Sequence, residues 1–165
     1  NRGALRFAVI VGCGVRSDAF LLVLPHKDWL GASNAMNLAI EDAGITINDI
    51  DYINAHGTST PTNDRIETLA IKNTFKDLAN KIPISSTKSM IGHSLGASGA
   101  LEIIACINST IENIIHPTIN QENSDPDCDL NYVPNKNISK EVNFALSNSF
   151  GFGGQNACVV VKKYQ

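Results

Sequence analysis

The chain has 165 residues, of which 43% are hydrophobic and 18% charged, and its formal net charge is −3. This length is enough for one domain with a substantial core, and the slightly acidic balance gives no electrostatic basis for binding nucleic acid or an anionic membrane surface. The sequence contains no apolar run that approaches the ~18 residues a transmembrane helix needs.

The N-terminus and the cysteines indicate how the chain is processed and in which redox environment it occurs. The first residues, NRGALRF, have neither an initiating Met nor the pattern of a signal peptide, which predicts a fragment or a processed product. The four cysteines form no CxxC pair, which argues against a zinc ribbon and a thioredoxin-type redox motif. A chain of this length with sparse cysteines favours reduced thiols in a reducing compartment.

The first part of the chain alternates predicted strands and helices. Residues 5–15 are rich in β-branched and aliphatic side chains and end at glycines, so they predict a strand. Residues 29–44 have apolar side chains near helical spacing and end at a Gly, which predicts a helix. A short strand is expected over 51–57. A helix follows over 61–75, with Pro61 in its first turn.

The second part ends in a pair of strands. Residues 81–87 predict another short strand, and 96–113 predict a helix that is apolar on almost all sides and therefore buried between two layers. Residues 117–141 are loop-like. Residues 142–150 and 155–163 are expected to be strands around the glycine-rich turn GFGG. The sequence therefore predicts one α/β layered domain over residues 1–165.

Polar clusters follow three of these predicted strands. His56 lies in NAHGTSTPTND, Lys88 and His93 lie in SSTKSMIGHSLGASG, and the third cluster is SNSFGFGGQN. Sites in α/β folds are built at the carboxyl ends of strands, so a site is expected where these clusters meet.

Each candidate side chain also has a structural explanation. His56 alone can be a hydrogen-bonded turn residue, and the small residues around His93 allow either substrate approach or tight helix packing. Lys88 can be a solvated surface amine, but the surrounding segment has the composition of an interior. Glu102 on the next helix is a candidate partner for a buried ammonium group, which would need one.

Three other chemistries are less well supported. GHSLG matches the G-x-S-x-G elbow of serine hydrolases with Ser94 as nucleophile, but the only later His is His116, and the acids before it lie on the helix that follows at once. A metal site at His56, Asp64 and His93 lacks a ligand spacing that would support it. GFGGQN departs from GxGxxG and precedes no predicted helix, which argues against a dinucleotide site.

The motifs DYINAHGTSTPTND, SSTKSMIGHSLGASGALE and ALSNSFGFGGQNA, in this order, resemble the C-terminal half of a β-ketoacyl-[acyl-carrier-protein] synthase of the KAS II type. The resemblance runs over the whole chain. HGTST and TKSMIGH favour the stand-alone fatty-acid enzyme over modular polyketide ketosynthases. The resemblance implies an α/β, thiolase-like fold in which βαβαβαββ forms one half of an αβαβα layered sandwich.

In this family a Cys accepts an acyl chain, and the enolate formed by decarboxylation of a malonyl thioester attacks it. His56 and His93 match the two histidines that serve the malonyl substrate, as donors to the developing oxyanion. Lys88 matches the family's lysine and is expected to pair with Glu102 and to influence the protonation of the nearby His.

Further site residues follow from the same resemblance. Phe152 matches a gating phenylalanine, and its backbone N–H is expected to contribute to the oxyanion hole for the acyl thioester. Thr58 and Thr60 are expected to hydrogen bond to the pantetheine arm of the carrier. Loop freedom around Phe152 is expected from three glycines, namely Gly151, Gly153 and Gly154.

The sequence departs from the family at two places. The DTACSS-like motif that holds the nucleophile is absent, and Cys13, Cys106, Cys128 and Cys158 are each interpreted as structural thiols. The chain is therefore expected to be half of an enzyme and inactive alone. Leu21 and Val23 replace a His and a Thr of the family near the pantetheine channel.

The resemblance implies no cofactor and no catalytic metal. The expected partners are acyl carrier protein in its acyl and malonyl forms and a second copy of the full-length protein. The expected location is the bacterial cytoplasm or the plastid stroma. A non-catalytic subunit similar to a chain-length factor stays open as an alternative, although the presence of His56, Lys88 and His93 argues against it.

Overall fold

The computed structural model describes residues 3–18 and 29–165. Leu21 and Val23 lie outside the described residues. The elements are β1 (Ala8–Ser17), α1 (Leu30–Asp42), β2 (Tyr52–Asn54), α2 (Pro61–Phe75), β3 (Ile84–Ser85), α3 (Lys88–Ile91), α4 (Ser98–Glu112), β4 (Ile114–Ile115), β5 (Ile138–Ser139), β6 (Phe144–Gly151) and β7 (Gln155–Lys163), with 3-10 turns at Ile47–Asp49, Lys76–Leu78 and Leu95–Ala97.

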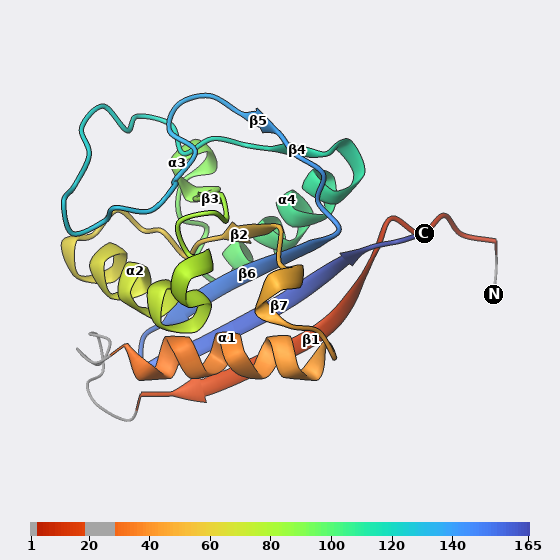
Figure 1. The fold of residues 1–165 in the computed structure, drawn as a ribbon, viewed down its shortest axis with the longest axis horizontal. Coiled ribbons are helices and arrows are strands. Elements are labelled where there is room, and N and C mark those ends of the chain that lie inside the picture. Colours follow the sequence, from red (N-terminus) through yellow and green to blue (C-terminus); the bar gives the residue numbers. More distant parts are fainter. Residues whose placement is uncertain (1–2, 19–28) are drawn as a thin grey trace.

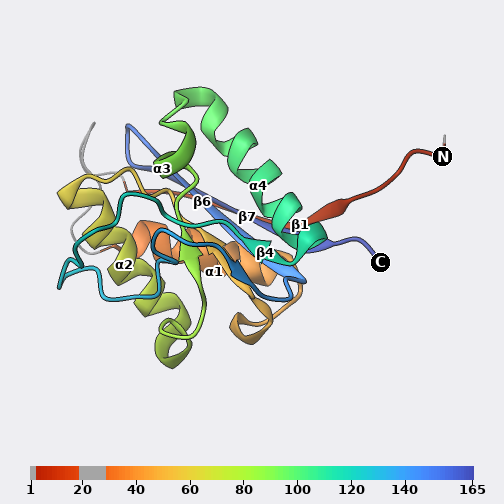
Figure 2. The same ribbon diagram turned by 90° about the horizontal axis from the view of Figure 1, so that it is seen from above.

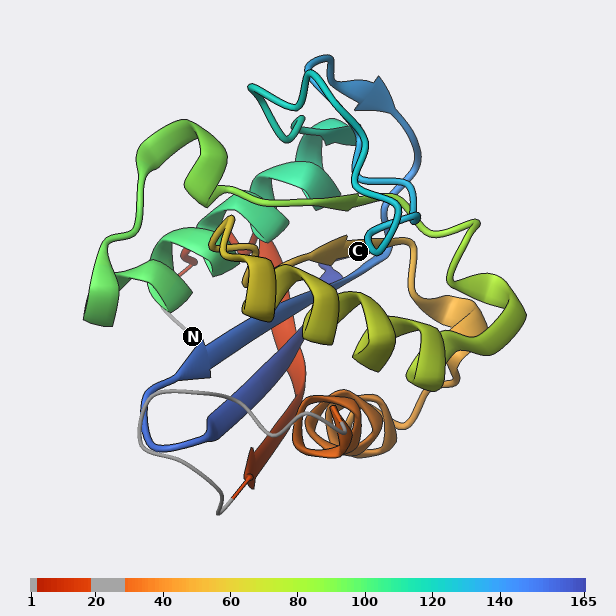
Figure 3. The ribbon, with the colours of Figure 1, turned by 90° about the vertical axis from the view of Figure 1, so that its left-hand side faces the viewer.

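A mixed five-stranded sheet organises the molecule, with the strand order β1-β7-β6-β2-β3 (Figure 1). Strands β1, β7 and β6 pair antiparallel, whereas β2 runs parallel to both β6 and β3. Helices α1 and α2 cover one face of the sheet and α4 covers the other (Figures 2 and 3). The order of the main elements is the predicted βαβαβαββ, and it confirms an α/β layered half-domain.

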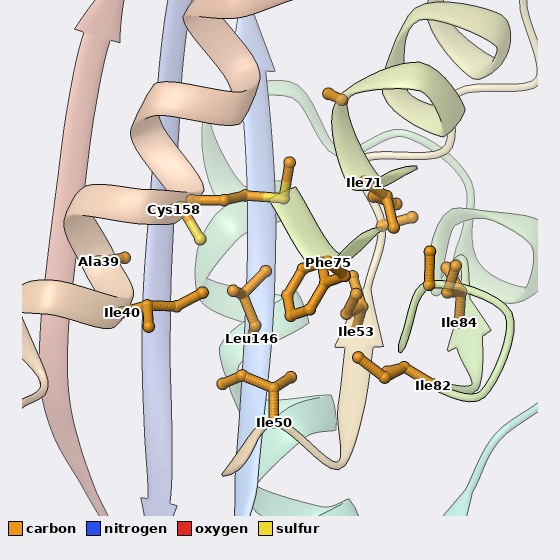
Figure 4. Close-up of a cluster of buried hydrophobic side chains, with 14 of the residues drawn as sticks. Ala39, Ile40, Ile50, Ile53, Ile71, Phe75, Ile82, Ile84, Leu146 and Cys158 are labelled. Atoms are coloured by element: carbon orange, nitrogen blue, oxygen red, sulfur yellow. The ribbon is translucent and has the colours of Figure 1, made fainter. Parts of the chain in front are cut away.

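The larger core lies between the sheet and the helices α1 and α2. Ile53 of β2, Leu146 of β6 and Phe75 of α2 are fully buried and lie against one another (Figure 4). A smaller core on the α4 face includes Cys106 and Val161. Burial of these apolar side chains stabilises the sheet from both sides, at ~25 cal/mol per Å² removed from water.

Helix α1 packs directly on the backbone of β1. A Cβ at Gly12 would lie 2.1 Å from the Ala39 carbonyl oxygen, and one at Gly14 would lie 2.0 Å from the Ala35 carbonyl oxygen. The glycines on the strand and the alanines on the helix therefore let the two backbones approach more closely than larger side chains would allow.

The predicted elements differ from the observed ones mainly at their ends. The helix over 61–75 and the strand over 155–163 have the predicted bounds. The strand predicted over 81–87 is shorter, because the Ser86 N–H bonds to the Thr118 hydroxyl at 3.1 Å and the chain then turns into α3. The loop predicted over 117–141 contains β5, which pairs with β4.

The sequence predicts that α4 is buried between two layers, but in the described residues only one of its sides is covered. Its inner side packs on the sheet, but Leu101, Ile104 and Ile111 are 37%, 53% and 39% exposed. The outer side of the helix is therefore apolar and uncovered. Within the described ranges, no helix is long and apolar enough to cross a membrane.

Candidate functional site

His56 follows β2 and is held by a buried carboxylate of α2. The backbone N–H groups of His56 and Gly57 each donate to Glu67, at 2.9 Å. Asn148 of β6 donates its side-chain amide to the same carboxylate at 3.1 Å. Burial raises the pKa of Glu67, and the two backbone hydrogen bonds oppose that rise. Glu67 thus fixes the backbone turn that carries His56.

The ring of His56 is fixed through its Nδ1 atom. The backbone N–H of Phe150 donates to Nδ1 at 3.2 Å, and Lys88 Nζ lies 3.4 Å from the same atom. Burial lowers the pKa of His56 to about 3, and the charge of Lys88 adds to this effect. Nδ1 accepts a hydrogen bond, so the neutral ring carries its hydrogen on Nε2.

Lys88 and Glu102 form the ion pair predicted from the sequence. Lys88 begins α3, Glu102 lies in the second turn of α4, and their side chains are buried together. Ser149 donates to the other carboxylate oxygen at 3.3 Å. Burial raises the pKa of Glu102, and Lys88 opposes that rise. A buried charge is tolerated only with such partners, so the pair places the Lys88 ammonium beside His56.

His93 is oriented by the turn that follows it. The backbone N–H of Leu95 donates to His93 Nδ1 at 3.1 Å, and Ser98 Oγ lies 3.1 Å from the same atom. Leu95 has a positive φ of 49°, a conformation that is uncommon for a residue other than Gly. Nδ1 of His93 is therefore an acceptor, and its hydrogen also resides on Nε2.

The two histidines meet beside an open pocket. Their ring centroids are 5.7 Å apart with an interplanar angle of 84°. The adjacent pocket has a volume of about 860 Å³ and is lined by Lys88 and His93 together with the segments around 57–61 and 118–123. The structure thus brings together His56, Lys88 and His93, whose catalytic roles stay predictions.

Thr58 and Thr60 both line this pocket, and their hydroxyl oxygens are 3.2 Å apart. Thr60 has a second role that the sequence analysis missed. Its hydroxyl accepts from the backbone N–H of Asn63 at 3.3 Å and caps the N-terminus of α2. The predicted contact with a pantetheine arm is compatible with this position and stays a prediction.

Phe152 lies in the turn between β6 and β7 and is 78% exposed. Gly153 and Gly154 have φ values of 80° and 71°, which suit glycine, whereas a Cβ at Gly151 would meet only the Gln155 Cβ, at 3.9 Å. It is Phe150 whose ring contacts His56, with the centroids 5.4 Å apart. The proposed gating and oxyanion roles of Phe152 stay predictions.

Three of the four cysteines do not have the surroundings of a nucleophile. Cys106 and Cys158 are fully buried, and burial raises the pKa of both thiols. Burial also raises the pKa of Cys128. Cys13 is exposed on β1 and its backbone N–H bonds to Asp42. A reactive cysteine needs a lowered pKa, which none of the three shifted thiols has.

The serine-hydrolase alternative does not fit the geometry. Ser94 follows α3 rather than a strand, and its φ of −88° differs from the strained turn of a nucleophile elbow. His116 instead contacts Tyr52 and Thr87. No group of metal-ligating side chains occurs among the residues for which positions are described.

Sequence reasoning missed Glu67, Phe150 and His116. The sequence analysis gives no role to Glu67, although a carboxylate on the helix after a candidate His is a candidate for binding the turn between them. Phe150 acts through its backbone N–H and its ring, for which the sequence carries no distinct signal. His116 was considered only as a triad member.

Comparison with known proteins agrees with the fold. Residues 7–122 match the family described as beta-ketoacyl synthase, C-terminal domain. The chain is 48% identical over 164 residues to 3-oxoacyl-[acyl-carrier-protein] synthase 2 of Synechocystis sp., covering 99% of this chain and 39% of that relative. The chain thus spans about two fifths of the length of this relative.

Solved structures show the same fold. The ishigamide ketosynthase/chain length factor matches with a TM-score of 0.94 and 38% identity. A type II PKS acyl-carrier protein in complex with its ketosynthase bound to the hexaketide matches with a TM-score of 0.96 and 37% identity. Each match covers 99% of this chain and 40% of the other.

Proposed function

Because the chain belongs to the family of β-ketoacyl synthase C-terminal domains, we propose that it is the part of a 3-oxoacyl-[acyl-carrier-protein] synthase that decarboxylates the malonyl substrate. The complete protein would then perform a decarboxylative Claisen condensation in fatty acid biosynthesis. The name of the Synechocystis relative supports this activity.

The observation that carries the proposal is the state of the two imidazoles. Backbone N–H groups occupy Nδ1 of both His56 and His93, so each neutral ring has its hydrogen on Nε2. Two such donors on rings 5.7 Å apart can stabilise one developing oxyanion without a metal ion.

The chemistry uses these donors in the malonyl half of the reaction. Loss of CO₂ from the malonyl thioester breaks a C–C bond and leaves the electron pair as an enolate, whose oxygen accepts from the two Nε2–H groups. The enolate carbon attacks an acyl thioester on a Cys supplied by the rest of the protein. The tetrahedral intermediate collapses, and the Cys leaves as a thiolate.

The remaining assignments belong to this proposal. Lys88, held by Glu102, keeps His56 neutral, and Thr58 and Thr60 bind the pantetheine arm of acyl carrier protein. Phe152 acts as the gate of the acyl site. The protein works as a homodimer without a cofactor in the bacterial cytoplasm or the plastid stroma. The exposed apolar side of α4 supports a layered sandwich whose second half covers it.

A non-catalytic subunit similar to a chain-length factor is the second candidate. One solved neighbour is a ketosynthase/chain length factor, so the fold alone serves both roles. The buried Lys88–Glu102 pair and the two oriented imidazoles favour catalysis, because a subunit that only shapes a cavity has no use for them.

The proposal is tested with acyl and malonyl carrier proteins as substrates. The complete protein should form β-ketoacyl product, and the 165-residue chain alone should form none because it lacks the nucleophile motif. Product from the isolated chain, or none from the complete protein under conditions where a known synthase is active, would contradict it.

A further inference from the structure

His116 lies at the centre of a buried polar cluster that the proposed reaction does not use. Its Nε2 atom is 3.0 Å from the Thr87 hydroxyl and 3.1 Å from the Tyr52 hydroxyl. Asn54 donates its amide to the same two hydroxyls, at 2.6 Å and 3.1 Å. Tyr52, Asn54 and Thr87 are all buried, so their polar groups depend on one another.

The direction of these hydrogen bonds follows from the backbone contact of His116. Its Nδ1 atom lies 3.1 Å from the Pro117 carbonyl oxygen, which can only accept. The hydrogen of the neutral ring therefore resides on Nδ1, and Nε2 is an acceptor. Burial lowers the pKa of His116, although the bond to Pro117 opposes this, so the ring is neutral near pH 7.

Nε2 of His116 is thus the final acceptor in a series of hydrogen bonds that runs from the Asn54 amide through the Thr87 hydroxyl. The Thr87 oxygen receives a hydrogen from Asn54, so the Thr87 hydroxyl hydrogen must be donated elsewhere, and Nε2 is 3.0 Å away. Without this acceptor, the Thr87 hydroxyl would be buried with an unused donor, which costs more than the bond itself contributes.

This cluster joins the two segments that carry the predicted catalytic groups. Asn54 ends β2, two residues before His56, and Thr87 immediately precedes Lys88. Their 2.6 Å hydrogen bond sets the spacing of the two segments just before Lys88 Nζ and His56 Nδ1 approach to 3.4 Å. A shift of Thr87 would therefore move Lys88 relative to His56.

Residues 116–119 form a strap along residues 85–89. Beyond His116, the Thr118 hydroxyl accepts from the Ser86 N–H at 3.1 Å, and the Ile119 N–H donates to the Ser89 hydroxyl at 3.0 Å. Thr118 and Ile119 also line the pocket. The strap therefore connects the pocket wall to the segment that places Lys88.

We propose that His116 is a positioning residue for the malonyl half of the reaction: its Nε2 atom fixes Thr87 and Asn54, and through them the contact between Lys88 and His56. This inference rests on the proposed function. It predicts a selective defect, because His56 and Lys88 serve malonyl decarboxylation, whereas transfer of the acyl chain to the nucleophilic Cys does not use them.

Three variants of the complete protein test the role of Nε2. His116→Leu removes the acceptor, His116→Asn offers an amide only near the Nδ1 position, and His116→Gln places an amide oxygen near the Nε2 position. We expect kcat for malonyl-carrier decarboxylation to fall about 10- to 100-fold in the Leu and Asn variants, as for a small misplacement of reacting groups. KM and the rate of acyl transfer should stay unchanged, and the Gln variant should regain most of the rate.

A second pair of variants changes the other partner of this hydrogen bond, the Thr87 hydroxyl. Thr87→Val removes the hydroxyl at nearly constant volume, whereas Thr87→Ser keeps it, so only the Val variant should show the selective loss. This pair decides the matter if His116→Leu does not fold.

The outcomes separate the two proposals. Equal loss of decarboxylation and acyl transfer, equal rates in the Gln and Leu variants, or no loss in any variant would each overturn the role of His116 while the proposed function stands. A wild-type protein that folds but decarboxylates no malonyl-carrier protein would instead overturn the proposed function, and this inference with it.

Discussion

At the scale of residues, the site is distinguished by how its polar atoms are used. A His after a strand is commonly a turn residue, and Nδ1 of His56 does bind the backbone of Phe150. That bond also determines the tautomer, so a structural contact and a catalytic donor coexist in one ring. His93 repeats this arrangement with Leu95.

The ionisation of His56 gives a prediction at this scale. Its pKa is lowered from 6.5 to about 3, so the unfolded chain binds a proton there between these values and the folded protein does not. His56 therefore contributes stability that is present above pH 6.5 and is lost as the pH falls toward 3. The His56 imidazole signal in an NMR spectrum is identified as the one missing in a His56→Gln variant. Its chemical shift should stay that of a neutral ring from about pH 8 to about pH 5.

A midpoint for this signal near the ordinary value for His would contradict that prediction, since it would mean that His56 is neither buried nor close to Lys88. A matched comparison of thermal unfolding completes the test. The loss of stability between about pH 7 and about pH 4 should be smaller in His56→Gln than in the wild type.

The sequence predicted the parts of the site that follow from simple chemistry. Lys88 lies in a segment of interior composition, and a buried ammonium needs a carboxylate, so Glu102 could be named in advance. Glu67 and His116 could not be assigned, because their roles depend on tertiary contacts with the His56 turn and with residues 85–89. The hydrogen bonds from the His56 and Gly57 backbone to Glu67 span 11 and 10 residues and follow no standard capping pattern.

At the scale of elements, the contact between β1 and α1 shows how small residues determine a distance. Gly14 lies against the backbone of Ala35 and Ala39, which cannot move as a flexible side chain can. The pattern of apolar residues predicted both elements. It did not predict that they would touch backbone to backbone, because glycine in a strand has other uses as well.

Substitution of Gly14 tests this contact. Gly14→Val should lower the free energy of unfolding by about 1–3 kcal/mol, because the new side chain overlaps the Ala35 carbonyl and forces α1 away from the sheet. The measurement is chemical denaturation of the complete protein.

Gly96→Ala is the matched control. A Cβ there would meet no atom within 4 Å, and Gly96 is not among the glycines with positive φ. It should therefore change stability little or raise it slightly. A Gly14→Val variant as stable as the control would show that α1 does not pack this closely.

At the scale of the whole molecule, the sequence predicts the order of the elements but not the exposure of one side of α4. Alternating strands and helices predicted the layered α/β fold, which the structure confirms. The apolar pattern of α4 predicts a helix buried between two layers, yet Leu101, Ile104 and Ile111 are exposed. Under the proposed function, the second half of the layered sandwich would cover this side of α4.

At this scale, the proposed function places the nucleophile in another part of the protein. The chain spans about two fifths of the relatives it matches, and burial raises the pKa of three of its thiols. Under the proposed function, this part supplies the donors for the malonyl enolate, and the acyl-binding Cys comes from the rest of the protein. The two partial reactions therefore depend on different parts of the protein and can be measured separately.

The most direct test is the rate of malonyl-carrier decarboxylation in the complete protein with His56→Ala or His93→Ala, beside Ser94→Ala as the control. Each His variant should lose about 100-fold or more, as expected when a donor to an oxyanion is removed, while acyl transfer to the Cys and thermal stability are retained. Ser94→Ala should behave like the wild type. Near-normal decarboxylation in both His variants would contradict the paired-donor mechanism.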